Sequence, residues 1–148
     1  RTFTLMKDPR SGPIAVVTLV LVLLLKFAAL LALIEQQHAV ALIIVPLLGR
    51  SALLGLFLTT PYVRAGGLGQ ALADHLPRSA GKQVLAVSGL ACVLIAGLSG
   101  FFAVVLAVVL FAWLRQVMLR RLGGTTGDTA GALLELLEVA MLVGLALI

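Results

Sequence analysis

Long runs of apolar residues divide the chain into segments that are separated by short polar or glycine-containing stretches. The runs reach the roughly 20 residues that an α-helix needs to cross a hydrocarbon core about 30 Å thick. Strands of a transmembrane barrel would instead alternate apolar and polar residues, a pattern that these runs do not show. We therefore predict helical spans at about residues 13–34, 39–58, 83–98, 101–119 and 129–148.

The apolar run over residues 83–119 is too long for one ordinary crossing, and the pair Ser99 and Gly100 is its natural break. Of the 148 residues, 61% are hydrophobic and only 11% are charged. Together with a mean hydropathy of +1.19, this composition lies far from the average of soluble domains. The sequence therefore predicts an all-α integral membrane protein, in which residues 1–148 form one transmembrane helical domain.

Lys and Arg residues gather before the first predicted span, between the second and third, and at the junction of the fourth and fifth. With five crossings these places lie on one side, which the positive-inside rule identifies as cytoplasmic. The polar loops and most of the formal net charge of +5 lie on that face. Orientation and attraction to anionic lipid headgroups explain Arg1, Arg78, Lys82 and Arg115. No nucleic-acid partner is expected, since no aromatic residues are interleaved with these basic ones.

Ionisable residues also occur within the predicted spans. At 1.5 Å per residue, Lys26 lies about 20 Å below the cytoplasmic surface and Arg50 about 12 Å below it. Asp128, Glu135 and Glu138 fall within about 80° of one another on the last span. Charges at such depth need a partner or a wet cavity, so we expect the acids to be the counter-charges of the two cations. Two interpretations stay open: an ion-pair ladder that holds helices together, or a site that binds Mg²⁺ or arranges cations around a phosphate.

Two glycine-rich segments occupy the predicted cytoplasmic loops. Residues 123–128 (Gly-Gly-Thr-Thr-Gly-Asp) lead into the last span, where glycines allow close ligand approach and helix-start N–H groups attract anions. This segment is a candidate phosphate cradle but not a P-loop, because the Gly-Lys-Ser/Thr ending is absent. An N-cap role for Thr126 or Asp128 is equally open. In the segment 61–69, Arg64 can pair bidentately with a phosphate, whereas Tyr62 can serve as an interface anchor.

These segments, in this order, resemble the adenosylcobinamide-GDP ribazoletransferase, or cobalamin synthase, family. The resemblance rests on residues 6–12 (Met-Lys-Asp-Pro-Arg-Ser-Gly), Lys26, residues 46–50, residues 61–69, and residues 122–128 with Glu135 and Glu138. It implies an Mg²⁺-dependent enzyme of phosphotransferase type in the bacterial or archaeal inner membrane, active on its cytoplasmic face. Such an enzyme joins adenosylcobinamide-GDP to α-ribazole, or to α-ribazole 5′-phosphate, and releases GMP. A homo-oligomer is left open.

The resemblance and the residue chemistry together assign expected roles. Catalytic roles fall to the acids Asp8, Asp128, Glu135 and Glu138, of which Asp128 and Glu135 are the expected Mg²⁺ ligands. The residues expected to bind substrate or phosphate are cations and loop residues: Lys7, Arg10, Lys26, Arg50, Tyr62, Arg64, Gly67, Gly69, Gly123, Gly124, Thr126 and Gly127. Such a transfer depends mainly on positioning and charge stabilisation.

Members of the family look longer at the N-terminus, with an acidic segment and further spans ahead of the matching residues. We therefore expect the chain to be the C-terminal portion of a longer enzyme, with further metal ligands in the remaining part. The main rival hypothesis is a small transporter or channel component in which Lys26, Arg50, Glu135 and Glu138 line a path. A CDP-alcohol phosphotransferase is a weaker alternative, because its Asp-Gly-x-x-Ala-Arg signature is absent. A purely structural membrane subunit is the last.

Overall fold

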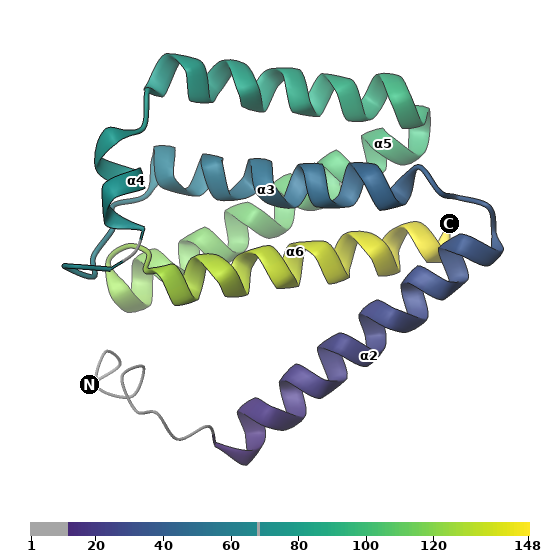
Figure 1. Cartoon of the computed structure of the whole chain (residues 1–148), viewed down its shortest axis with the longest axis horizontal. Helices are drawn as coiled ribbons and strands as arrows, with labels where there is room; N and C mark the ends of the chain where they lie inside the picture. Colours follow the sequence, from purple (N-terminus) through teal and green to yellow (C-terminus); the bar gives the residue numbers. More distant parts are fainter. Residues whose placement is uncertain (1–11, 68) are drawn as a thin grey trace.

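The computed structural model of the chain describes residues 12–67 and 69–148, and within them every extended regular element is a helix. The helices are α2 (Pro13–Glu35), α3 (Ala41–Thr59), α4 (Gln70–His75), α5 (Arg78–Leu122) and α6 (Gly127–Leu147). All of these except α4 are long and apolar enough to cross a membrane. The described part of the chain is therefore an all-α membrane protein, as its sequence predicts (Figure 1).

The longest helix, α5, folds back on itself, so that its two limbs run in opposite directions (Figure 1). The reversal is at Gly97, where φ is 58° and ψ is −127°. Glycine adopts positive φ at little steric cost because it has no Cβ. The reversal thus lies two residues before the expected break at Ser99 and Gly100. Gly100 has a different role, because its Cα faces the backbone carbonyl of Cys92 across the turn and leaves no room for a side chain.

The other helix bounds lie near the expected spans, with two differences. Helix α5 begins at Arg78, directly after Pro77, and ends at Leu122, so it extends beyond the apolar run at both ends. The apolar run does not predict these ends, because a helix can continue into polar residues where the chain leaves the hydrocarbon core. Helix α4 is the second difference, since residues 70–75 are expected as loop and form a short helix instead.

Helix α3 packs on both α5 and α6, whereas α2 packs on α6. In Figure 1, α2 meets the bundle near its C-terminal end and diverges from it toward Pro13. Its buried residues accordingly lie in the C-terminal half, at Ala29 and Leu33. The core between α3 and α6 contains the fully buried Leu56 and Leu137. The exposed apolar side chains of α2 suit a hydrocarbon surrounding, where only helices satisfy their own backbone polar groups.

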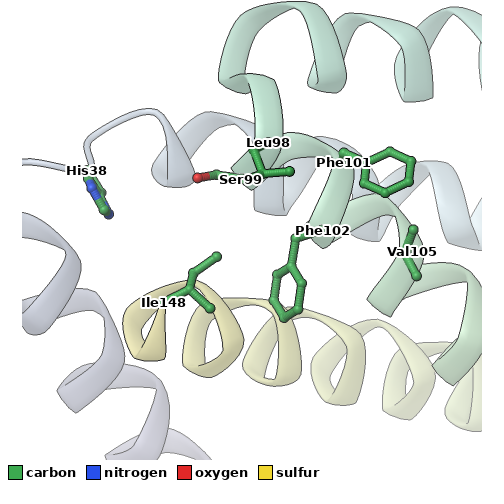
Figure 2. Close-up of a pocket in the computed structure, with 7 residues that line it drawn as sticks. All are labelled: His38, Leu98, Ser99, Phe101, Phe102, Val105 and Ile148. Atoms are coloured by element: carbon green, nitrogen blue, oxygen red, sulfur yellow. The ribbon is translucent and has the colours of Figure 1, made fainter.

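The α3–α4 loop and the α5–α6 turn meet at one end of the bundle, at the left of Figure 1. The opposite end contains a cavity of about 490 Å³ (Figure 2). Phe101 and Phe102 line this cavity with other apolar residues, and His38 and Ser99 are its polar members. None of the residues that line it is a Lys or Arg. The candidate chemistry for an anionic ligand therefore lies at the loop end and beneath it.

Candidate anion-binding site

Four charged side chains from α2, α3 and α6 meet about halfway along α3 and α6. Lys26 Nζ of α2 lies 2.7 Å from Glu135 Oε2 and 2.8 Å from Glu138 Oε2, both on α6. Arg50 Nη1 of α3 lies 2.9 Å from Glu138 Oε1. The structure therefore confirms that acids of the last span are the counter-charges of both cations. We call these four residues the intramembrane charge network, in which two positive and two negative charges balance.

The members of the intramembrane charge network differ in exposure. The side chains of Glu138 and Lys26 are 11% and 18% exposed, whereas those of Glu135 and Arg50 are 47% and 65% exposed. Charged groups are strongly unfavourable in hydrocarbon, so the exposed atoms of Glu135 and Arg50 belong next to water, a ligand or further polypeptide. The two interpretations of these residues, an ion-pair ladder and a ligand site, thus apply to one cluster. It holds α2 and α3 to α6, and it also leaves the guanidinium group of Arg50 accessible.

Gly49 sets the close approach of α3 to α6 beside Arg50. A Cβ at this position would lie 2.8 Å from Leu134 Cδ1 and 3.1 Å from Glu138 Cγ. Both distances are shorter than ordinary van der Waals contact between carbon atoms. The absence of a side chain at Gly49 therefore lets Glu138 reach the guanidinium group of Arg50.

The variant Gly49→Ala is expected to destabilise the protein by roughly 1–3 kcal/mol, the usual cost of overpacking. The added methyl group would displace the Leu134 side chain and press on Glu138, so the carboxylate that pairs with Arg50 would have to shift. Reversible unfolding in bicelles would measure the loss. Gly131→Ala is a matched control, since a Cβ at Gly131 meets nothing within 4 Å. Equal stability of the two variants would show that the helices do not approach as described.

The two glycine-rich loops pair with each other through their backbones. Val63 N–H donates to Thr125 O at 2.9 Å, and Thr125 N–H donates to Pro61 O at 2.9 Å. These bonds form an isolated parallel bridge between Tyr62 and Thr125. A Cβ at Gly124 would collide with the Pro61 carbonyl group and lie 2.6 Å from Val63 Cγ1. The sequence predicts that both loops share one side of the membrane, but no sequence pattern signals a single bridge.

A capping box starts α6 directly after this pairing. Thr126 Oγ1 accepts from Thr129 N–H at 3.3 Å, and Thr126 N–H donates to Thr129 Oγ1 at 2.8 Å. The N-cap interpretation is therefore confirmed for Thr126, whereas Asp128 lies in the first turn, where an acid interacts favourably with the helix dipole. Gly123 ends α5 in the left-handed conformation, with φ of 74°, a common helix terminator. The loop geometry thus follows largely from helix-end chemistry.

Arg64 and Asp128 join the α3–α4 loop to the first turn of α6. Arg64 Nη1 lies 2.8 Å from Asp128 Oδ2, and the two side chains are 39% and 61% exposed. Exposed pairs of this kind contribute only about 0–1 kcal/mol to stability. A guanidinium group has five N–H donors, so Arg64 retains donors for a second, anionic ligand. This pair orients a cation on the surface where the two loops meet.

Tyr62 packs over the glycines of its own loop. A Cβ at Gly69 would lie 2.8 Å from Tyr62 Cε2, and one at Gly67 would collide with the Tyr62 hydroxyl group. The ring also lies 6.2 Å, centroid to centroid, from that of Phe57. Gly67 and Gly69 therefore leave space for an aromatic ring, which is a structural reason for two glycines that we predict to bind substrate.

A polar cavity of about 470 Å³ adjoins Tyr62 at the loop end. Its lining includes Thr60 at the end of α3, Asp74 of α4 and Arg78 at the start of α5. These three polar residues are not among those that the sequence predicts as site residues. Arg78 is expected only as an orientation signal, and the helix that carries Asp74 is expected as loop. A polar segment with an acid four residues before a cation is the one sequence signal that could have pointed here.

The two expected Mg²⁺ ligands face different partners, Arg64 for Asp128 and Lys26 for Glu135. Seven residues on one helix separate their Cα atoms by about 10 Å, whereas Mg²⁺ binds oxygen ligands at about 2.1 Å. Within residues 12–67 and 69–148, no three His, Cys, Asp or Glu side chains gather as a metal site would require. The two acids therefore do not fit as joint ligands in this arrangement. The exposed carboxylate of Asp128 alone suits a metal ion whose other ligands are water and phosphate oxygens.

The predicted site residues thus occupy two levels. The loop level contains Tyr62, Arg64, Gly67, Gly69, Gly123, Gly124, Thr126, Gly127 and Asp128, and the lower level contains Lys26, Arg50, Glu135 and Glu138. Lys7, Asp8 and Arg10 lie outside the described residues, so their roles stay predictions.

The fold and the site together define a class of protein. It is a multi-pass membrane protein with a charge network within its helices, and its paired loops present a cation that suits an anionic ligand. Residues 1–146 match the family described as cobalamin-5-phosphate synthase. The chain belongs to this family, and the resemblance that its loops show is confirmed.

Three relatives named adenosylcobinamide-GDP ribazoletransferase illustrate the similarity. Identity is 78% over 147 residues in Pseudomonas fluorescens strain Pf0-1 and 68% over 148 residues in Pseudomonas savastanoi pv. phaseolicola. It is 66% over 147 residues in Pseudomonas putida strain GB-1. These alignments cover 99–100% of this chain but 60–61% of the relatives, so the chain spans about three fifths of their length. No solved structure matches the chain.

Proposed function

We propose that this chain carries the diphosphate-binding part of an adenosylcobinamide-GDP ribazoletransferase, with its loop end facing the cytoplasm of a bacterial cell. The observation that carries the proposal is the Arg64–Asp128 pair on two paired loops, in a chain 78% identical to a relative of that name. In the proposed reaction, an alcohol group of α-ribazole or its 5′-phosphate attacks the phosphoryl group nearer the cobinamide. The bond from that phosphorus to the GMP oxygen breaks, and the alcohol loses its proton.

Arg64 is the residue that we assign to the diphosphate. Asp128 holds one side of its guanidinium group at 2.8 Å, and the remaining donors suit bidentate contact with phosphoryl oxygens. Preorganised donors of this kind stabilise charge that develops in the transition state. Among the acids in the described part of the chain, the exposed carboxylates of Asp128 and Glu135 are candidates to accept the alcohol proton, and a carboxylate that binds Mg²⁺ would leave this role to the other. The family match gives no support to the alternative of a transporter.

The loop end also offers groups for a metal ion and for the nucleoside part of the substrate. When bound, Mg²⁺ would neutralise charge on the diphosphate, with Asp128 as its ligand from the described residues and phosphate and water oxygens among the others. The cavity of about 470 Å³ beside Tyr62 falls within the usual size range of ligand pockets. Its threonine, aspartate and arginine side chains can hydrogen-bond the polar edges of a nucleoside.

The variant Arg64→Gln tests the proposal in the whole enzyme in its native membrane. Release of GMP from adenosylcobinamide-GDP in the presence of α-ribazole is expected to fall about 10²–10³-fold, as when one transition-state donor is removed. Arg64→Lys should retain only part of the rate, because an ammonium group lacks the planar fork. Arg121→Gln removes an exposed charge at the same end and should release GMP at the wild-type rate. Wild-type turnover in Arg64→Gln would overturn the assignment.

A further inference from the structure

Arg115 lies on the second limb of α5 and is directed at the C-terminal end of α3. Its Nη2 donates to Thr59 O at 2.6 Å, and its Nε lies 3.1 Å from Thr59 Oγ1 and 3.0 Å from Thr60 Oγ1. One guanidinium group therefore holds a carbonyl and two hydroxyl oxygens at the point where α3 ends. In the sequence, the orientation of the chain in the membrane is a sufficient reason for Arg115, and this role requires a positive charge but none of these contacts.

The end of α3 needs such a group from outside. The last carbonyl groups of a helix lack partners within it, and a cation there interacts favourably with the helix dipole. Helix α3 has no basic residue in its own last turn. The first limb of α5 supplies a second, weaker contact, in which Arg78 Nη1 donates to Leu58 O at 3.3 Å. The two limbs of α5 thus cap α3 together, and Arg115 makes most of the contacts.

The capped residues lead directly into the loop that carries Tyr62 and Arg64. Thr60 is 5% exposed and has left the helix, with φ of −133° and ψ of 130°. The next residue, Pro61, already accepts the bond from Thr125 N–H that pairs the two loops. No flexible segment separates the oxygens that Arg115 holds from the start of the loop pairing. Fixing Thr60 therefore fixes the direction in which the loop leaves α3.

We infer that Arg115 is a positioning residue, which holds the α3–α4 loop in register with the α5–α6 turn so that Arg64 meets Asp128. The consequence for catalysis rests on the proposed function, whereas the consequence for loop pairing does not. A lysine at this position would keep the positive charge that orients the chain. It could not reproduce a planar fork that contacts three oxygens from two nitrogens.

Amide hydrogen exchange of the whole protein in lipid nanodiscs tests this inference. In Arg115→Gln, exchange at the Val63 and Thr125 amides is expected to accelerate about tenfold or more, because a set of charge-assisted hydrogen bonds is lost. Arg115→Lys should show an intermediate acceleration. Arg120→Gln is the matched control, since it removes an exposed charge five residues along the same helix and should leave both amides unchanged. If Arg115→Gln does not insert into the membrane, Thr59→Val is the substitute variant. It removes one acceptor of Arg115 without changing any charge.

Turnover of the same variants gives a second measurement. If Arg115 is a positioning residue, Arg115→Gln should lower kcat more than it raises KM. Arg115→Lys should then restore part of the lost kcat. If Val63 and Thr125 exchange at the same rate in Arg115→Gln and Arg120→Gln, the inference is wrong. A wild-type enzyme that releases no GMP would overturn the proposed function instead, and the exchange rates would still decide the role of Arg115.

Discussion

The variant Glu138→Gln is expected to unfold with a free energy about 3 kcal/mol below that of the wild type, at the lower end of the range for breaking a buried ion pair. Glu138 accepts hydrogen bonds from both Lys26 and Arg50, and its side chain is only 11% exposed. An amide keeps the shape of the side chain but cannot neutralise two cations. The lower end applies because Arg50 is 65% exposed and is partly screened.

Glu135→Gln is the matched control for this prediction. It removes the same charge one turn earlier on α6, from a side chain that is 47% exposed. Lys26 keeps Glu138 as its partner in this variant, so we expect a loss of no more than about 1 kcal/mol. Unfolding of both variants in bicelles, by steric trapping or by titration with a denaturing detergent, measures the difference. Similar losses would mean that Glu138 does not connect the two cations.

The variant Gly124→Ala is expected to lower GMP release by the whole enzyme about 100-fold, the effect of displacing a reacting group by roughly 1 Å. A Cβ at Gly124 would collide with the Pro61 carbonyl group and with Val63 Cγ1. The loops would have to separate, which breaks the bonds between Val63 and Thr125 and moves Arg64 away from Asp128. Initial rates with saturating α-ribazole give the measurement.

Gly127→Ala distinguishes this steric effect from a general sensitivity of the glycine-rich turn. A Cβ at Gly127 would lie 3.6 Å from the Tyr62 hydroxyl oxygen, which is ordinary contact. Because Gly127 begins α6 and has no positive φ, alanine fits its backbone conformation. Steric fit alone therefore predicts that this variant keeps more activity than Gly124→Ala, whereas the role in phosphate binding that the sequence predicts for Gly127 would lower its activity as well. If both variants lose activity equally, glycine is needed in the turn for a reason other than loop pairing.

Much of the membrane fold follows from the sequence, because the length of an apolar run and the cost of burying a charge are strong physical constraints. The runs predict where α2, α3 and α6 lie, and the depth of Lys26 predicts that it has an acidic partner. The position of the reversal in α5 is harder to predict. Several glycines near the middle of the run could adopt positive φ, and the sequence does not show that Gly97 is the one that does.

The finer features of the site depend on contacts between segments far apart in the chain. The pairing of Val63 with Thr125 and the contacts of Arg115 with Thr59 have no local pattern that would reveal them. When only the sequence is known, the orientation of the chain in the membrane is a sufficient explanation for a positive charge near the membrane surface. Only the structure shows that Arg115 is directed at a helix end.

A double-mutant cycle on Lys26 and Glu138 tests most directly whether the acids of α6 face inward and hold the neighbouring helices. The free energy of unfolding in bicelles would be measured for Lys26→Met, Glu138→Gln and the double variant. Residues in contact typically show coupling energies of about 0.5–3 kcal/mol, and for a partly buried pair at 2.8 Å we expect more than about 1 kcal/mol. Losses that simply add, to within about 0.5 kcal/mol, would contradict an inward-facing Glu138 paired with Lys26.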